Sequence, residues 1–99
     1  MVSLLVQVEK GVSVGHRGRF DIIANILSIA TNGAKKTQLM YKCNMSFRQL
    51  EAYLSLCTEK RLLAKRIRNG GKDATVYEIT NKGLSFLHAY HTLKALMTI

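Results

Sequence analysis

The stretch from residue 35 to residue 59 restricts the possible folds more than any other part of this chain. A short helix is predicted over residues 37–42, and Asn44 ends it. Ser46 then precedes a run with helical apolar spacing, where a serine oxygen accepts the first free backbone N–H groups of a helix. Gln49 follows three residues later, which is the spacing of a capping box. These signals predict two helices joined by a tight turn.

The second helix of this pair is predicted over residues 47–60. Its apolar residues recur at helical spacing on one face: Phe47, Leu50, Leu54 and Cys57. The opposite face carries mostly polar or small residues: Arg48, Ala52, Ser55 and Glu59. At the rise of an α-helix it would be roughly 21 Å long. A helix of that length can lie in the major groove of DNA.

Other segments before and after this pair also have regular signals. A first helix is predicted over residues 20–31, ending at Asn32-Gly33. Its buried face would contain Phe20, Ile23, Ile26, Leu27 and Ala30. Strands predicted over 62–68 and 75–79 enclose a glycine-rich hairpin tip at 69–74. Thr80 is the expected cap of a last helix that continues to about Met97.

The predicted order of elements is helix, helix, helix, strand, turn, strand, helix. This is the order of a winged helix-turn-helix, a mainly α fold with a small β-hairpin. The chain has 99 residues, enough for one domain. We divide it into an N-terminal strand or arm (1–18), the winged helix-turn-helix domain (19–80) and a C-terminal helix (81–99). Alternating valines suggest the strand in the first segment.

The charge of the chain indicates a polyanionic partner. Fifteen Lys and Arg stand against six Asp and Glu, a net charge of +9. Two basic clusters contain no acid, one before the predicted recognition helix and one after it: Lys35, Lys36, Lys42 and Arg48, then Lys60, Arg61, Lys65, Arg66, Arg68 and Lys72. Such residues neutralise phosphates and supply most of the affinity for nucleic acid. We expect double-stranded DNA as the partner, ahead of an anionic membrane or an acidic protein.

Base reading is predicted for Arg48 and Gln49, because arginine pairs bidentately with guanine and glutamine with adenine. Ala52 is small enough for close approach to a base. Phosphate contacts are predicted for Lys35 and Lys36 before the helix pair, and for Arg66, Arg68 and Lys72 around the hairpin tip. The expected function is a DNA-binding transcriptional regulator. The alternative is a winged-helix module that docks onto proteins of a transcription or chromatin assembly.

The last helix has two apolar stripes, which exceeds what one small domain has to cover. Leu84 and Leu87 form one stripe. The other has the 4, 3, 4 spacing of a short coiled-coil seam: Phe86, Tyr90, Leu93 and Met97. We therefore expect a homodimer formed through this helix.

Other functional classes find little support. No nucleophile–base pair or paired carboxylates are visible, so we expect no enzyme activity and no cofactor. Cys43 and Cys57 lack CxxC spacing, and His88 and His91 have no third ligand nearby, so we expect no metal site. The N-terminal apolar run is too short for a signal peptide or membrane span, which predicts a cytoplasmic protein. No small-molecule site is evident.

Three stretches of the chain also carry a resemblance to a known family: RFDIIANIL (19–27), AKKTQLMYKCNMSFRQLEAYL (34–54) and YEITNKGLSFL (77–87). They resemble the archaeal winged-helix DNA-binding regulators and chromatin-associated proteins. The resemblance covers about residues 19–97 and implies DNA binding, with dimerisation through a C-terminal helix. It implies a DNA-facing role for these residues: Lys36, Thr37, Ser46, Arg48 and Gln49. The chain departs from the family at Lys42-Cys43, where small residues are usual, and its final helix is shorter.

Overall fold

The computed structural model describes residues 17–67 and 75–98. The elements follow the predicted order: α2 (Arg19–Ile29), η1 (Ala30–Asn32), α3 (Lys36–Cys43), α4 (Phe47–Glu59), β1 (Leu63–Ile67), β2 (Thr75–Ile79) and α5 (Asn81–Met97). This confirms the mainly helical fold with one antiparallel hairpin. The predicted N-terminal strand or arm and the hairpin tip, with Arg68 and Lys72, lie outside the described residues.

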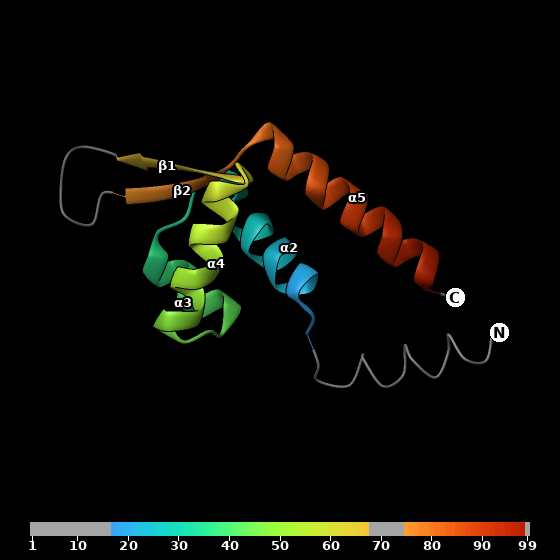
Figure 1. Cartoon of the computed structure of the whole chain (residues 1–99), viewed down its shortest axis with the longest axis horizontal. Helices are drawn as coiled ribbons and strands as arrows, with labels where there is room; N and C mark the ends of the chain where they lie inside the picture. The colour runs from blue at the N-terminus through green and yellow to red at the C-terminus, as the bar shows by residue number, and fades with distance from the viewer. Residues whose placement is uncertain (1–16, 68–74, 99) are drawn as a thin grey trace.

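α2 lies between two parts of the fold. In Figure 1, α3, α4 and the β-hairpin gather at one side of the domain, while α5 runs along the other side of α2. β1 and β2 pair in the register Leu63↔Ile79 to Ile67↔Thr75. Ala34 adds a single antiparallel bridge to Tyr77, with N···O distances of 2.9 and 2.8 Å. That bridge fixes the start of α3 to the hairpin.

The turn between α3 and α4 has the predicted chemistry. Asn44 adopts the left-handed conformation with φ of 53°, which asparagine tolerates better than most residues. The N–H of Met45 bonds the carbonyl of Met40 at 3.2 Å and closes the end of α3. Ser46 Oγ then accepts from the Gln49 N–H at 3.1 Å, and Gln49 Oε1 accepts from the Ser46 N–H at 3.4 Å. The capping box is confirmed.

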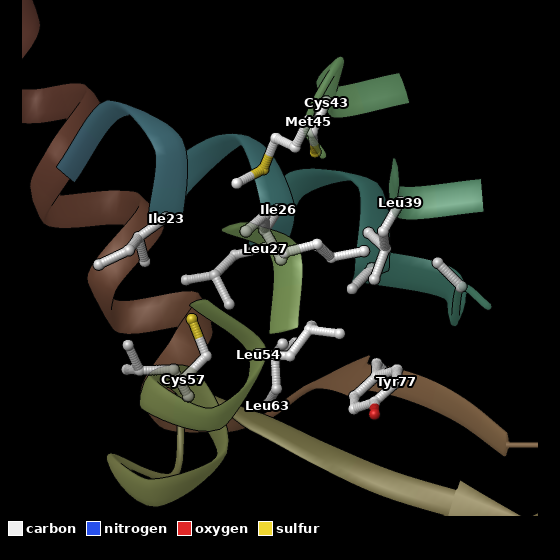
Figure 2. Packing of buried hydrophobic residues seen from close by; sticks show 14 residues of the cluster. Ile23, Ile26, Leu27, Leu39, Cys43, Met45, Leu54, Cys57, Leu63 and Tyr77 are labelled. Carbon is white, nitrogen blue, oxygen red and sulfur yellow. The ribbon is translucent and has the colours of Figure 1, made fainter. Parts of the chain in front are cut away.

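The core lies between α2, α3, α4 and the root of the hairpin (Figure 2). Its most enclosed side chains include Ile26, Leu27, Leu39 and Leu50, all at 0% exposure. Two predicted core residues are placed differently. Phe20 is 62% exposed and Phe47 is 56% exposed, because both lie in the first turn of their helices, where the helix extends beyond the core.

Both cysteines are core residues. Cys43 is 1% exposed at the last position of α3, and Cys57 is 0% exposed in α4. Burial raises the pKa of the Cys43 thiol, and it raises the pKa of Cys57 to about 11. Both side chains therefore stay protonated at neutral pH and pack as small apolar groups. Its place in the core gives Cys43 a packing role, at a position where the resemblance leads one to expect a smaller residue.

A compact junction joins the end of α4, the root of the hairpin and the start of α5. Thr80 Oγ1 donates to the Arg61 carbonyl at 2.6 Å and accepts from the Gly83 N–H at 3.0 Å. Lys82 Nζ donates to the Lys60 carbonyl at 2.9 Å. Arg61 itself is left-handed, with φ of 63°. Thr80 is thus the predicted cap of α5 and also a clamp on the segment after α4.

The far part of α5 is attached to the start of α2. The rings of Phe86 and Phe20 meet edge to face, with centroids 6.0 Å apart. One turn further along, the Tyr90 hydroxyl donates to the Asp21 carboxylate. Lys94 Nζ approaches the same carboxylate at 3.8 Å. The backbone N–H of Gly18 also donates to Asp21, at 2.9 Å, and so begins α2.

The Tyr90–Asp21 bond should stabilise the protein at intermediate pH and lose this effect at both acid and alkaline pH. The bond from Tyr90 lowers the pKa of Asp21 below its ordinary 3.8, so its stabilisation exists above that pH and is lost as the pH falls through the folded-state pKa. Burial, with the same bond, raises the pKa of Tyr90 from 10.0 to about 12. That contribution is complete below pH 10 and is lost between pH 10 and 12.

We expect Tyr90→Phe to lower the free energy of unfolding at pH 7 by about 1–2 kcal/mol, the loss of a hydrogen bond to a charged group. Urea unfolding at pH 3, 7 and 11.5 checks this. The difference between wild type and variant should narrow at both extremes. An equal difference at all three pH values would show that the bond does not control the titration of Asp21.

Candidate nucleic-acid interface

The outward face of α4 forms the centre of the candidate interface. Leu50, Leu54 and Cys57 face the core, which turns Arg48, Ala52, Ser55 and Glu59 to the exposed side of the helix. All four of these residues are exposed. The face offers a guanidinium near its start, a small surface in the middle and a carboxylate near its end.

Two of the predicted contact residues also form the N-terminal cap of α4. Ser46 and Gln49 are exposed, but both belong to the capping box that begins α4. The Oε1 atom of Gln49 is engaged by the Ser46 N–H, whereas its Nε2 group takes no part in the box. A contact from Gln49 to a base would therefore use the Nε2 donors, with the cap holding the side chain in place.

The start of α3 presents the next group of predicted residues. Lys35 and Thr37 are exposed, Lys35 being the N-cap residue without a side-chain capping bond. Lys36 is different, because its ammonium group is paired with the Glu51 carboxylate. It also lies 5.1 Å from the centre of the Phe47 ring. Lys36 therefore connects the first turn of α3 to the first two turns of α4.

The described part of the hairpin contributes Arg66 and Lys65. Arg66 Nε lies 3.0 Å from Glu78 Oε1 on the neighbouring strand, and its side chain is 65% exposed. Lys65 pairs in register with Tyr77, so its side chain lies on the other face of the hairpin. Arg68 and Lys72, predicted to contact the backbone, are outside the described residues.

A shallow groove of about 360 Å³ runs between α4 and the hairpin. Its lining combines two lysines, two glutamates and neutral residues: Lys36, Glu51, Leu54, Ser55, Thr58, Glu59, Lys65 and Tyr77. No role was predicted for Glu51, and Lys65 was predicted only as one cation of the basic cluster after α4. Glu51 lies one helical turn after Phe47, so both can reach the same partner. The spacing of Phe47 and Glu51 was the only signal in the sequence for a shared partner. It does not identify Lys36 as that partner.

The predicted dimerisation residues divide into two pairs. Phe86 and Tyr90 are partly buried against α2 within the same chain. Leu93 and Met97 are 56% and 41% exposed, and Leu96 beside them is 76% exposed. Leu84, near the start of α5, is also 47% exposed. The open apolar surface of α5 therefore consists of Leu84 and a larger group at its C-terminal end.

Two further observations concern other kinds of site. Within residues 17–67 and 75–98, no group of three His, Cys, Asp or Glu side chains is placed to hold a metal ion. In the same ranges, no helix combines the length and the apolar character needed to cross a membrane.

Comparison with known proteins agrees with this arrangement. A family model described as winged helix-turn-helix matches residues 16–98. A DNA-binding protein of Sulfolobus solfataricus, Sso10a-2, has a similar structure, with a TM-score of 0.69, 22% identity and 81% of each chain covered. No curated protein gave a match.

Two bacterial structures are also similar. The Staphylococcus aureus MepR–DNA complex has a TM-score of 0.70 at 12% identity, covering 98% of this chain and 82% of that one. Reduced MarR from Escherichia coli has a TM-score of 0.65 at 16% identity, covering 94% and 66%. At these identities the likeness establishes a shared fold.

Proposed function

The chain belongs to the winged helix-turn-helix family, and from that premise we propose that it is a DNA-binding transcriptional regulator. In the proposed complex, α4 lies in the major groove and the hairpin lies on the adjacent backbone. The carrying observation is the capped α4, whose exposed face begins with Arg48 and is flanked in the sequence by two groups of exposed basic residues. These groups are Lys35 and Lys42 on the α3 side and Lys60, Arg61 and Lys65 after α4.

The charge and shape of this side support DNA over other partners. α4 has 13 residues, which gives about 20 Å of helix for a groove. Its central positions, Ala52 and Ser55, are small enough for close approach to base edges. The flanking lysines and arginines match the phosphates on either side of a groove. A DNA complex of similar fold, that of MepR, adds support by analogy.

The proposal is tested by fluorescence anisotropy with labelled duplex DNA at increasing salt. If about five phosphates are neutralised, the logarithm of the binding constant should fall with the logarithm of salt concentration at a slope near −4.5. Absence of binding even at about 50 mM salt, where electrostatic association is strong, would refute DNA binding. Stronger competition by structured RNA than by duplex DNA would identify RNA as the partner instead.

We further propose that two copies associate through the C-terminal end of α5. The supporting observation is the exposure of Leu93, Leu96 and Met97 on one end of this helix, an apolar surface that water does not favour. Light scattering at micromolar concentration should give twice the chain mass of 11.1 kDa. Leu93→Glu with Leu96→Glu should give the mass of a single chain. A monomeric wild type at that concentration would contradict the proposal.

A further inference from the structure

We propose that Glu51 acts as an electrostatic brake on DNA binding, because it holds Lys36 in an ion pair that phosphate has to displace. This inference rests on the proposed function and concerns the regulation of affinity at the same surface. Its consequence is a lower affinity for arbitrary duplexes than the net charge of the chain would give. Glu51 thus becomes a determinant of specificity, although it is acidic and lies on the recognition helix.

The geometry of the pair supports this role. Lys36 Nζ contacts Glu51 Oε2 across the two helices. The Phe47 ring, one turn before Glu51, lies on the same ammonium group at 5.1 Å. The side chain of Lys36 is 33% exposed and that of Glu51 is 44% exposed. The cation is therefore held on two sides, yet both charges remain open to a ligand that approaches from the groove.

A phosphate that binds near the Lys36–Glu51 ion pair loses free energy of binding. A phosphate that contacts Lys36 either separates the ion pair or comes close to the Glu51 carboxylate, which repels it. The bond to Glu51 also raises the pKa of Lys36, which favours the charged form of the lysine. A base-specific contact elsewhere on α4 offsets the cost only when the correct sequence is present. This is how repulsive elements improve discrimination.

A second pair repeats the pattern on the hairpin. Arg66, another predicted phosphate ligand, is held by Glu78 at 3.0 Å. The other described cations of the two basic clusters form no ion pair with any residue in 17–67 or 75–98. They are Lys35, Lys42, Arg48, Lys60, Arg61 and Lys65. The described surface thus contains free cations, which attract DNA, and held cations, which engage it only at a cost.

The test compares Glu51→Gln with Glu59→Gln on random-sequence duplex DNA. Both substitutions remove one negative charge from the groove side of α4, but Glu59 forms no ion pair with another described residue. We expect Glu51→Gln to bind about fivefold more tightly than Glu59→Gln, the upper range for a partly exposed pair. Its salt slope should steepen by about 0.9, since Lys36 gains one phosphate. Thermal melting establishes that both variants remain folded.

The double variant Lys36→Met with Glu51→Gln identifies the group that the brake holds. Its net charge equals that of the wild type, and we expect affinity and salt slope to return close to wild-type values. If it retains the full gain of Glu51→Gln, Lys36 is not the group released. If Glu51→Gln and Glu59→Gln behave alike, removal of general charge explains the gain and the brake is refuted.

Elution from heparin separates this inference from the proposed function. Heparin is a polyanion without bases, so it reports the release of Lys36 even if duplex DNA is not the natural partner. Later elution of Glu51→Gln than Glu59→Gln, with no binding of wild type to duplex DNA, would support the brake and refute the DNA reader. Binding of the wild type to DNA with equal elution of both variants would refute the brake alone.

Discussion

Replacement of Gly83 by alanine should destabilise this protein by about 3 kcal/mol, within the range for overpacking a filled site. Gly83 is buried in the first turn of α5. A Cβ atom there would lie 2.3 Å from the Leu62 carbonyl oxygen and 2.6 Å from Ile79 Cγ1. The oxygen belongs to the backbone at the root of the hairpin, so it cannot move aside as a flexible side chain would.

Thermal unfolding followed by circular dichroism measures this effect. For a domain of this size, the expected fall in Tm is roughly 12–24 °C. Ser85→Ala is the matched control, because Ser85 is an exposed position of the same helix. Alanine favours a helix by about 0.5 kcal/mol over serine, so this control should be neutral or slightly stabilising. Equal melting temperatures for Gly83→Ala and wild type would show that α5 can shift away from Leu62 without loss.

Replacement of Arg48 by alanine should cost about 1–3 kcal/mol of binding to a selected DNA site, the value of one bidentate base contact. Arg48 is exposed at the second position of α4, and within 17–67 and 75–98 no carboxylate pairs with it. It is therefore free to bind a base. Selection from a random duplex library supplies the site, and anisotropy then measures both affinity and preference.

Two variants give the controls for Arg48→Ala. Arg48→Lys keeps the charge but removes the planar fork, so it should keep the salt slope of the wild type and lose the preference for the selected base. The neighbouring Gln49 is tested with Gln49→Glu, because glutamate also completes the capping box. Gln49→Ala would weaken the cap as well as any base contact, so it would not isolate the base contact. If Arg48→Ala weakens all duplexes equally, Arg48 contacts phosphate and does not read sequence.

Local signals in the sequence predicted the local structure because their causes are local. Asn44, Ser46 and Gln49 act within a few residues of one another, and their turn and cap form as predicted. Strand 75–79 and the end of α5 at Met97 also have the predicted limits. The winged helix-turn-helix follows from the order of these elements, and the family match confirms it.

Features that depend on contacts between distant residues were not predictable in this way. Helical spacing assigned Phe20 and Phe47 to buried faces, but it does not show how far the core extends along each helix. The same limit applies to Lys36, which was predicted as a free phosphate ligand. Its pairing with Glu51, 15 residues away, depends on how α3 crosses α4. The contact residues at DNA and in a dimer stay predictions.

The junction around Thr80 has a mechanical consequence. Because Thr80 and Lys82 bond the carbonyls of Arg61 and Lys60, α5 is joined to the end of α4 with little slack. α5 has 17 residues, so it acts as a lever of about 25 Å. In the proposed dimer, the contact between the two levers would set the spacing between the two recognition helices, and with it the distance between the half-sites that they read.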